Sequence, residues 1–348
     1  MTDAKPVRQE RWQFLDAIRG IAALAVVFQH VLWYVSPTFE SFFATVWSPG
    51  RFGVVAFFIV SGFIVPQSLE SKGNIRAFWT ARFYRLFPAY WSSLLLIAIV
   101  LGLGLSWHPP ISLKYLLQWL VNLTMLQEFV KIQDINPVAW TLGLELALYG
   151  AITLAFARGF LKRTWLIAMS LLFLLAVAST ILPNVFHIRF PAGGAAVCSS
   201  IILGLVLYRW FTGSLANSDA GVIGFFCLAV TILSAFANYS PSRLLSDPLQ
   251  PTQLSAISSV LTGYVFFIVM FLFRGAKFPN WTLWLGKVSY SLYLLHPVTG
   301  MVFPKEMNHW ARAVLEIVSS LTLAWLGYKF IEEPFIKIGK RRIRSLKN

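Results

Sequence analysis

An arginine and a histidine stand eleven residues apart in the apolar stretch FLDAIRGIAALAVVFQH, which runs from Phe14 to His30. An α-helix turns 100° per residue, so residues eleven apart return to within about 20° of the same face, about 16 Å along the axis. Arg19 and His30 therefore share one stripe, and Asp16 lies within reach of an i, i+3 ion pair with Arg19. A cation at one end of a stripe and a base deeper along it suit the binding of an anion followed by proton transfer.

A structural explanation of the same residues is also open. Asp16 and Arg19 can form a simple ion pair near a membrane surface, and His30 can be a hydrogen-bonded packing residue. Polar side chains deep in an apolar segment are costly, however, and those that occur usually face a protein interior or a watery cavity. The chemical interpretation gains support because other apolar segments also carry polar groups.

An arginine pair marks a second candidate segment, RFYRLFPAYW. Arg82 and Arg85 are three residues apart and share a helical face, just before Pro88, which we take as the opening of a span. Such a pair can hold phosphate oxygens through charge-assisted hydrogen bonds. It can equally consist of ordinary positive charges at the inner membrane surface.

The remaining candidates lie in PVAWTLGLELALYG and GKVSYSLYLLHPV. Glu145 sits deep in the first of these segments, where we expect it to be protonated or paired with a cation. In the second segment Lys287 lies near the inner end, and Ser289 and His296 share a face. Pro297 weakens the local hydrogen-bond ladder, so His296 can have a local structural role instead of a chemical one.

Metal and cofactor motifs are missing from the sequence. It contains no zinc-type spacing, Walker loop, dinucleotide-binding fingerprint or nucleophile elbow. Cys198 and Cys227 belong to no metal-binding or redox spacing. We therefore expect no metal and no permanently bound cofactor.

The composition places all these residues in an integral membrane protein. Of the 348 residues 57% are hydrophobic and 12% are charged, and the mean hydropathy is +0.67, far from the balance of a soluble domain. The apolar segments are too long for outer-membrane strands, so we expect an all-α polytopic helical bundle that forms a single membrane domain over residues 1–348. The requirement of about twenty apolar residues per helix predicts ten spans, at residues 14–35, 50–69, 86–106, 137–157, 164–182, 191–210, 220–239, 252–273, 282–302 and 310–331.

The basic residues support this number of spans. Lys and Arg accumulate on the cytoplasmic side of membrane proteins. With the N-terminus in the cytoplasm, most of them fall in inner loops and tails, including those of the C-terminal KIGKRRIRSLKN. Adding or removing one span would destroy this asymmetry, so we expect both termini in the cytoplasm. The net charge of +15 then reflects topology, and we expect no nucleic-acid partner.

Taken together, these segments resemble the membrane-bound acyltransferase family 3, whose members acylate cell-surface glycans and related acceptors. Arg19 and His30 match the arginine, ten intervening residues and histidine of the family's opening helix. Ala17 stands where the family often has glycine, a difference that affects packing alone. The resemblance covers nearly the whole chain and continues through FFIVSGFIVP, RFYRLFPAY, WTLGLELALY, SYSLYLLHP and IEEPFIKIGKR.

The resemblance implies transfer of an acyl group, usually acetyl, from cytoplasmic acyl-CoA to a hydroxyl of a surface polysaccharide or lipid-linked glycan. It also implies the cytoplasmic (inner) membrane of a bacterium. Arg19, Arg82 and Arg85 would bind the CoA phosphates at the inner mouth while the thioester extends toward His30. His30 would act as general base or as transient acyl acceptor, and Asp16 would orient Arg19. We expect the stand-alone form of the family, with any extracytoplasmic catalytic partner supplied by a separate protein.

A transporter or flippase for a glycan or anionic substrate is the alternative, because intramembrane charges also line transport paths. The sequence has neither paired interrupted helices nor symmetry between its halves, which disfavours transport. A purely structural scaffold leaves the polar stripe unexplained. Membrane lipids are expected partners, and the sequence leaves open the acceptor, the acyl chain length and whether the protein forms a homo-oligomer.

Overall fold

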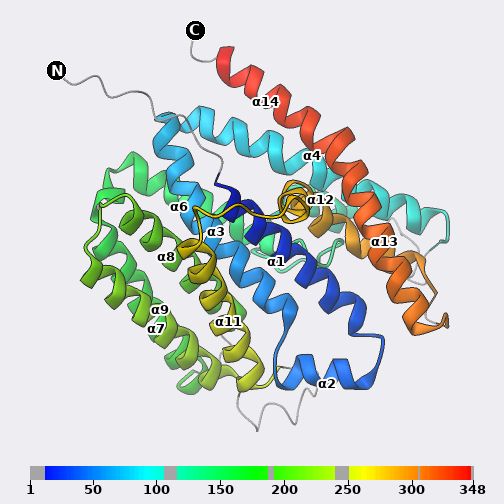
Figure 1. Cartoon of the computed structure of the whole chain (residues 1–348), viewed down its shortest axis with the longest axis horizontal. Coiled ribbons are helices and arrows are strands. Elements are labelled where there is room, and N and C mark those ends of the chain that lie inside the picture. The colour runs from blue at the N-terminus through cyan, green and yellow to red at the C-terminus, as the bar shows by residue number, and fades with distance from the viewer. Residues whose placement is uncertain (1–11, 106–115, 187–191, 240–250, 305, 346–348) are drawn as a thin grey trace.

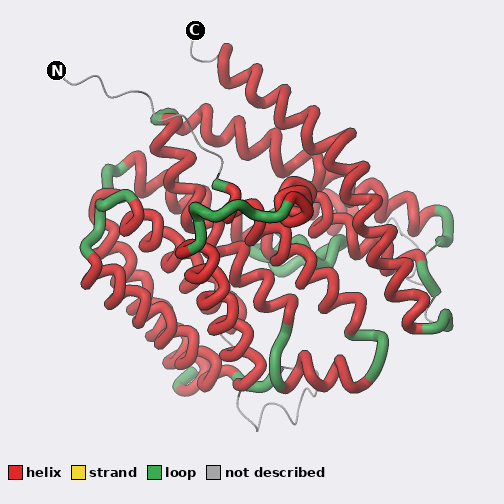
Figure 2. The backbone as a smooth tube through the Cα atoms, in the orientation of Figure 1, coloured by secondary structure: helices red, strands yellow, loops and turns green. Residues whose placement is uncertain are grey.

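The computed structural model describes residues 12–105, 116–186, 192–239, 251–304 and 306–345. These residues form helices joined by short loops and contain no strand (Figures 1 and 2). The short elements are α2 Pro37–Thr45, α5 Leu116–Asn122, the 3₁₀ turn η2 Phe160–Arg163, the π turn η3 Tyr328–Glu332 and α14 Glu333–Ser345.

Each of the ten predicted spans overlaps a long helix. These helices are α1 Gln13–Leu32, α3 Pro49–Lys72, α4 Ile75–Gly102, α6 Trp140–Ala157, α7 Thr164–Asn184, α8 Ala192–Phe211, α9 Asn217–Asn238, α11 Gln253–Leu272, α12 Asn280–Val302 and α13 His309–Gly327. Within the described residues, nine candidate spans are long and apolar enough to cross a membrane. Helix α12 is long enough but falls short in hydropathy because it carries many polar residues. The predicted class, a polytopic helical membrane bundle, is confirmed.

The predicted start of the third span is wrong. Residue 86 was expected to open it, but α4 begins at Ile75 and Pro88 lies inside the helix. Gly73, with φ 60°, ends α3, and the side chain of Asn74 caps α4 by accepting a hydrogen bond from the Ala77 N–H at 3.1 Å. Membrane helices tolerate an internal proline because neighbouring groups satisfy the carbonyl that it leaves free. The arginine pair therefore lies within α4 instead of preceding it.

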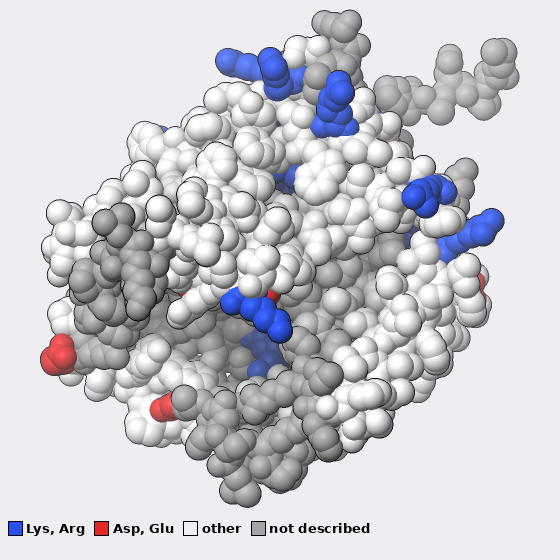
Figure 3. Space-filling model, turned by 180° about the vertical axis from the view of Figure 1, so that it is seen from behind, with Lys and Arg blue, Asp and Glu red and all other residues white. Residues whose placement is uncertain are grey.

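The helical structure continues beyond the last predicted span. Helix α13 continues through the π turn η3 into α14, so the tail that was expected to follow residue 331 is helical as far as Ser345. Helix α14 carries many of the basic residues of KIGKRRIRSLKN. On the face shown in Figure 3, most Lys and Arg side chains gather toward the same end of the molecule as α14. The positive-inside rule predicts that this end faces the cytoplasm.

Helix α1 lies near the centre of the bundle and packs chiefly against α12 and α3 (Figure 1). Glycines allow this close approach: a Cβ added to Gly20 would lie 2.7 Å from the backbone nitrogen of Gly286. A Cβ added to Gly286 would overlap the carbonyl oxygen of Asp16. This backbone-to-backbone packing brings the polar stripe of α1, which ends at His30, against the face of α12 that carries His296.

Candidate active site

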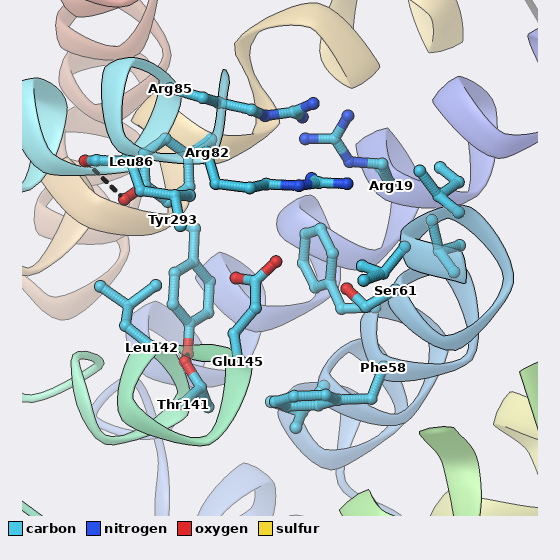
Figure 4. A pocket seen from close by; sticks show the side chains of 16 residues that line it. Arg19, Phe58, Ser61, Arg82, Arg85, Leu86, Thr141, Leu142, Glu145 and Tyr293 are labelled. Atoms are coloured by element: carbon cyan, nitrogen blue, oxygen red, sulfur yellow. Dashed lines mark hydrogen bonds between the residues drawn. The ribbon is translucent and has the colours of Figure 1, made fainter. Parts of the chain in front are cut away.

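Three arginine side chains from two helices converge in one cavity, named here the arginine cavity (Figure 4). Arg19 comes from α1, Arg82 and Arg85 come from α4, and Glu145 of α6 points toward them. The rest of the lining is mostly apolar and aromatic. The cavity has a volume of about 90 Å³, which is room for several waters, since one water needs about 10–15 Å³ on this measure.

Aromatic rings hold the Arg82 guanidinium in place. Its central carbon lies 4.8 Å from the ring centroid of Tyr149 and 5.2 Å from that of Phe78. A planar guanidinium over an aromatic face is a favourable cation–π contact. Arg82 also donates a hydrogen bond to the Tyr149 hydroxyl at 3.5 Å, and Tyr149 in turn donates to the carboxylate of Glu145. Tyr149 thus links the predicted acid to the predicted cation.

A buried glutamate that sequence reasoning did not select belongs to the same charge cluster. Glu332 is 3% exposed and lies in the π turn η3, an irregularity that often marks functional sites. It accepts a hydrogen bond from the Ser291 hydroxyl at 2.9 Å, and its charge acts on both Arg85 and Arg19. The sequence signal was the Glu-Glu-Pro run, but only the structure separates Glu332 from the neighbouring Glu333, which pairs with a lysine at the surface.

The charges around the arginine cavity are mixed but lean positive. Asp16, Glu145 and Glu332 all attract the charge of Arg19, and Asp16 has the largest effect of the three. Lys72, at the end of α3, adds a cation close to the arginine pair of α4. The nearby acids therefore compensate only part of the positive charge of α1 and α4 in this cavity. An anionic ligand would compensate the rest.

His30 lines a second cavity of about 310 Å³, named here the histidine cavity. Its side chain is exposed to this space, which Gln29 and Arg51 also line. Val54 of α3 and Tyr293 of α12 line both cavities, so the two spaces adjoin at these side chains.

Tyr293 is held firmly at this boundary. Its hydroxyl donates to the carbonyl of Val138 at 3.1 Å and lies 2.8 Å from the hydroxyl oxygen of Thr141. The loop that carries Val138 is fixed by Asn136, whose side-chain amide donates to the carbonyl of Leu294 at 2.9 Å. The wall between the two cavities is therefore tied to both α6 and α12.

His296 contacts His30 directly, although 266 residues separate them. The Nδ1 atom of His30 lies 2.7 Å from Nε2 of His296, and Nδ1 of His296 lies 3.1 Å from the carbonyl oxygen of Leu292. His296 is 4% exposed, while His30 faces the cavity. The predicted stripe of α1 thus leads from the arginine cavity to a pair of histidines.

Two other candidates from the sequence lie apart from both cavities. Lys287 is exposed and lines neither of them. Ser289 is buried, and its hydroxyl donates to the carbonyl of Gly286 at 3.0 Å within the same helix. Conversely, Ser61 and Phe58 of α3 line the arginine cavity and were not selected, because nothing in FFIVSGFIVP indicates which face is turned inward. Within the described residues no cluster of three or more potential metal ligands occurs.

The sequence profile of the acyltransferase domain family matches residues 12–329. The chain belongs to the membrane-bound acyltransferase family 3. The resemblance seen in the sequence is therefore confirmed, and the two cavities lie among residues that this profile covers.

Several curated proteins are similar to this acyltransferase family member. The peptidoglycan O-acetyltransferase OatA of Listeria monocytogenes is 26% identical, over 93% of this chain and 56% of that protein. Nodulation protein 10 of Rhizobium leguminosarum bv. viciae is 24% identical over 82% of each chain, and a putative acetyltransferase, ORF330, of Acidianus two-tailed virus is 25% identical over 80% of each. The chain thus spans just over half the length of the Listeria relative. No solved structure matches it significantly.

Proposed function

We propose that this protein transfers an acyl group, most simply acetyl, from cytoplasmic acyl-CoA to a hydroxyl of a cell-surface polysaccharide or lipid-linked glycan. The observation that carries the proposal is the pair of adjoining cavities, one with three guanidinium groups and the other with His30. Two of the similar proteins, a peptidoglycan O-acetyltransferase and a putative acetyltransferase, support the choice of acetyl and of a glycan acceptor.

The donor would bind through its phosphates. CoA is a polyanion with a long unbranched arm, and guanidinium groups bind phosphate oxygens in pairs of charge-assisted hydrogen bonds. Arg82 and Arg85 would hold the phosphates, and Arg19 would bind or position the donor with Asp16 as its orienting acid. The nucleotide would stay at the mouth while the arm carries the thioester inward.

The direction of this path follows from the charge distribution. The basic helix α14 packs against α4, and a Cβ added to its Gly339 would contact Tyr84, next to Arg85. The positive-inside rule assigns the α14 end of the bundle to the cytoplasm, where acyl-CoA is found. This topology fits the inner membrane of a bacterium, with the acceptor reaching His30 through the larger histidine cavity.

His30 would supply the chemistry of transfer. As a general base it takes the proton of the acceptor hydroxyl while the hydroxyl oxygen attacks the thioester carbonyl. The carbon–sulfur bond then breaks, and the CoA thiolate leaves and receives that proton. In the covalent variant the unprotonated ring nitrogen attacks the thioester carbonyl, the carbon–sulfur bond breaks, and the CoA thiolate leaves and takes the proton that the acylated imidazolium gives up. The acceptor hydroxyl then attacks the acyl carbon, the carbon–nitrogen bond breaks, and the hydroxyl proton returns to the ring. Both variants need one unprotonated ring nitrogen facing the cavity.

The proposal is tested in cells that carry the wild-type gene, the His30→Ala variant or no gene. Alkali-labile acyl esters on extracellular and lipid-linked polysaccharides are measured by mass spectrometry, with membrane abundance of the protein checked in parallel. We expect esters only with the wild type and with His309→Ala, a control that removes an exposed histidine outside both cavities. Esters at a normal level with His30→Ala, or none with the wild type, would overturn the proposal. Movement of a glycan without ester formation would identify a transporter.

A further inference from the structure

We infer that His296 is a positioning residue that fixes the tautomer of His30, so that Nε2 of His30 is the nitrogen that reacts. The inference deepens the proposed function, because it rests on His30 as the reactive residue. It adds the identity of the reacting atom and the group that selects it.

The two imidazole rings lie edge to edge, so that their facing nitrogens form a hydrogen bond and the rings are not stacked. Their planes are inclined by only 13°, and their centroids are 5.0 Å apart. Rings stacked face to face keep a separation of about 3.5 Å between their atoms, so the nitrogens of His30 and His296 could not then approach to 2.7 Å. The rings therefore lie nearly in one plane. Imidazole N–H bonds and lone pairs point along that plane, so one nitrogen donates directly to the other.

The direction of this hydrogen bond follows from the next group in the chain. The carbonyl oxygen of Leu292, 3.1 Å from Nδ1 of His296, can only accept. The backbone of Tyr293 also acts as an acceptor toward His296. Its carbonyl lacks the usual helical donor because Pro297, four residues later, has no N–H. Nδ1 of His296 must therefore carry a proton.

The tautomer of His296 then determines the tautomer of His30. With its proton on Nδ1, a neutral His296 presents a lone pair at Nε2. Nδ1 of His30 must donate to that lone pair, which leaves Nε2 of His30 unprotonated. Among the described residues neither ring contacts a carboxylate, so nothing offsets the cost of a charge on the buried His296.

This arrangement aims the basic nitrogen at the reactants. The Nδ1 edge of His30 is occupied by His296, and the opposite edge carries Nε2 on a side chain that lines the histidine cavity. When Nε2 takes up a proton or an acyl group, the Nδ1–H becomes more acidic and its hydrogen bond to His296 strengthens. The role parallels that of the orienting acid in serine hydrolases, with a neutral imidazole in its place.

Two substitutions separate positioning from packing. His296→Leu fills the space but offers no acceptor, whereas His296→Gln keeps an acceptor oxygen for the Nδ1–H of His30. A lost hydrogen bond to a group that becomes charged is worth about a 10- to 150-fold change in rate. We expect His296→Leu to lower kcat by this factor with KM for acetyl-CoA changed less than about threefold, and His296→Gln to recover most of the loss.

The tautomer itself is measured by nitrogen NMR on full-length protein with labelled histidine, after replacement of the three histidines other than His30 and His296. Comparison with His30→Ala assigns the signals. We expect the proton of His30 on Nδ1 in the wild type and in His296→Gln, and on Nε2 in His296→Leu. A wild-type proton on Nε2, or the same tautomer in the Leu variant, would overturn the inference.

The two proposals fail in different ways. If His30→Ala still acylates while the tautomers are as expected, the proposed function is wrong and the hydrogen-bond assignment stands. If His30→Ala is inactive but the wild-type proton lies on Nε2, the reverse holds. The wild-type spectrum decides the inference even if the Leu variant does not fold.

Discussion

Replacing Arg85 by glutamine tests how the arginine cavity holds its ligand. The guanidinium of Arg85 points toward that of Arg19, and its side chain makes no hydrogen bond within the described residues. Its electrostatic partners are of both signs, since Arg19 repels it and Glu332 attracts it. The side chain is therefore available to a ligand, and its loss leaves no buried hydrogen-bonding partner unsatisfied.

A charge-assisted hydrogen bond to a phosphate is worth about 1.5–3 kcal/mol, which corresponds to a Kd for CoA raised about 10- to 150-fold. The stability of the Arg85→Gln variant should stay within about 1 kcal/mol of the wild type, because the opposing charge effects largely cancel. Isothermal titration calorimetry with CoA in detergent gives the first quantity. Thermal unfolding followed by circular dichroism gives the second.

Arg209 provides the control. It is a buried arginine that is paired with Glu70 at 2.5 Å and 3.3 Å and donates to the carbonyl of Leu161 at 3.2 Å. Arg209→Gln should cost about 3 kcal/mol of stability, the low end for a buried pair, because the Glu70 side chain is still 29% exposed. Its CoA affinity should not change. Arg85 does not bind the donor if Arg85→Gln binds CoA as tightly as the wild type, or if both variants lose affinity equally while folded.

Three further substitutions probe packing and access. Gly286→Val should lower the unfolding midpoint, since overpacking costs about 1–3 kcal/mol. Gly221→Val should leave the midpoint unchanged, because the space around its Cβ position is open. Equal midpoints for the two variants would show that α1 and α12 can move apart without cost. Ser61→Trp should fill the arginine cavity and abolish binding of labelled acetyl-CoA without destabilising the fold, and retained binding would place the donor elsewhere. Glu316→Leu leaves the buried Arg312, 2.5 Å away in the wild type, without its ion-pair partner. It should cost about 3–5 kcal/mol of stability and leave the CoA affinity of the folded protein unchanged. A drop in CoA affinity would show that this ion pair belongs to the donor site.

The sequence predicted the helices better than their ends. The length of the apolar segments alone located all ten long helices. A segment that crosses lipid must satisfy its backbone hydrogen bonds internally, and a helix does so. The start of α4 was misplaced because Pro88 was taken as a helix opener. The stronger local signal was Gly73 followed by Asn74, a helix end and a helix cap side by side.

The candidate site was predicted in part for a similar reason. Helical periodicity predicts that Arg19 and His30 share one stripe of α1, and in the structure they line two adjoining cavities. Local spacing pairs Arg82 with Arg85, which line the same cavity. Contacts between distant helices lie beyond such reasoning. The pairing of His30 with His296 depends on how α1 and α12 pack, and periodicity fixes positions only within one helix.

Burial separates residues that look alike in the sequence. Lys287 and Ser289 share a helix with His296, yet only His296 reaches the stripe of α1. Glu332 differs from Glu333 by one position and is buried because the π turn directs it inward. Residue type and spacing do not distinguish the residues within either comparison, so the packed structure is needed to choose between them.

A donor held in the arginine cavity should present its acyl end to position 30. Bromoacetyl-CoA measures this directly in a His30→Cys variant that lacks the two native cysteines. Mass spectrometry should find the CoA adduct on the introduced sulfur, with the reaction blocked by excess CoA and slowed by adding Arg85→Gln. A His309→Cys control should show no reaction that CoA blocks. If iodoacetamide modifies the sulfur at position 30 but bromoacetyl-CoA does not, the donor does not reach this residue and the account is wrong.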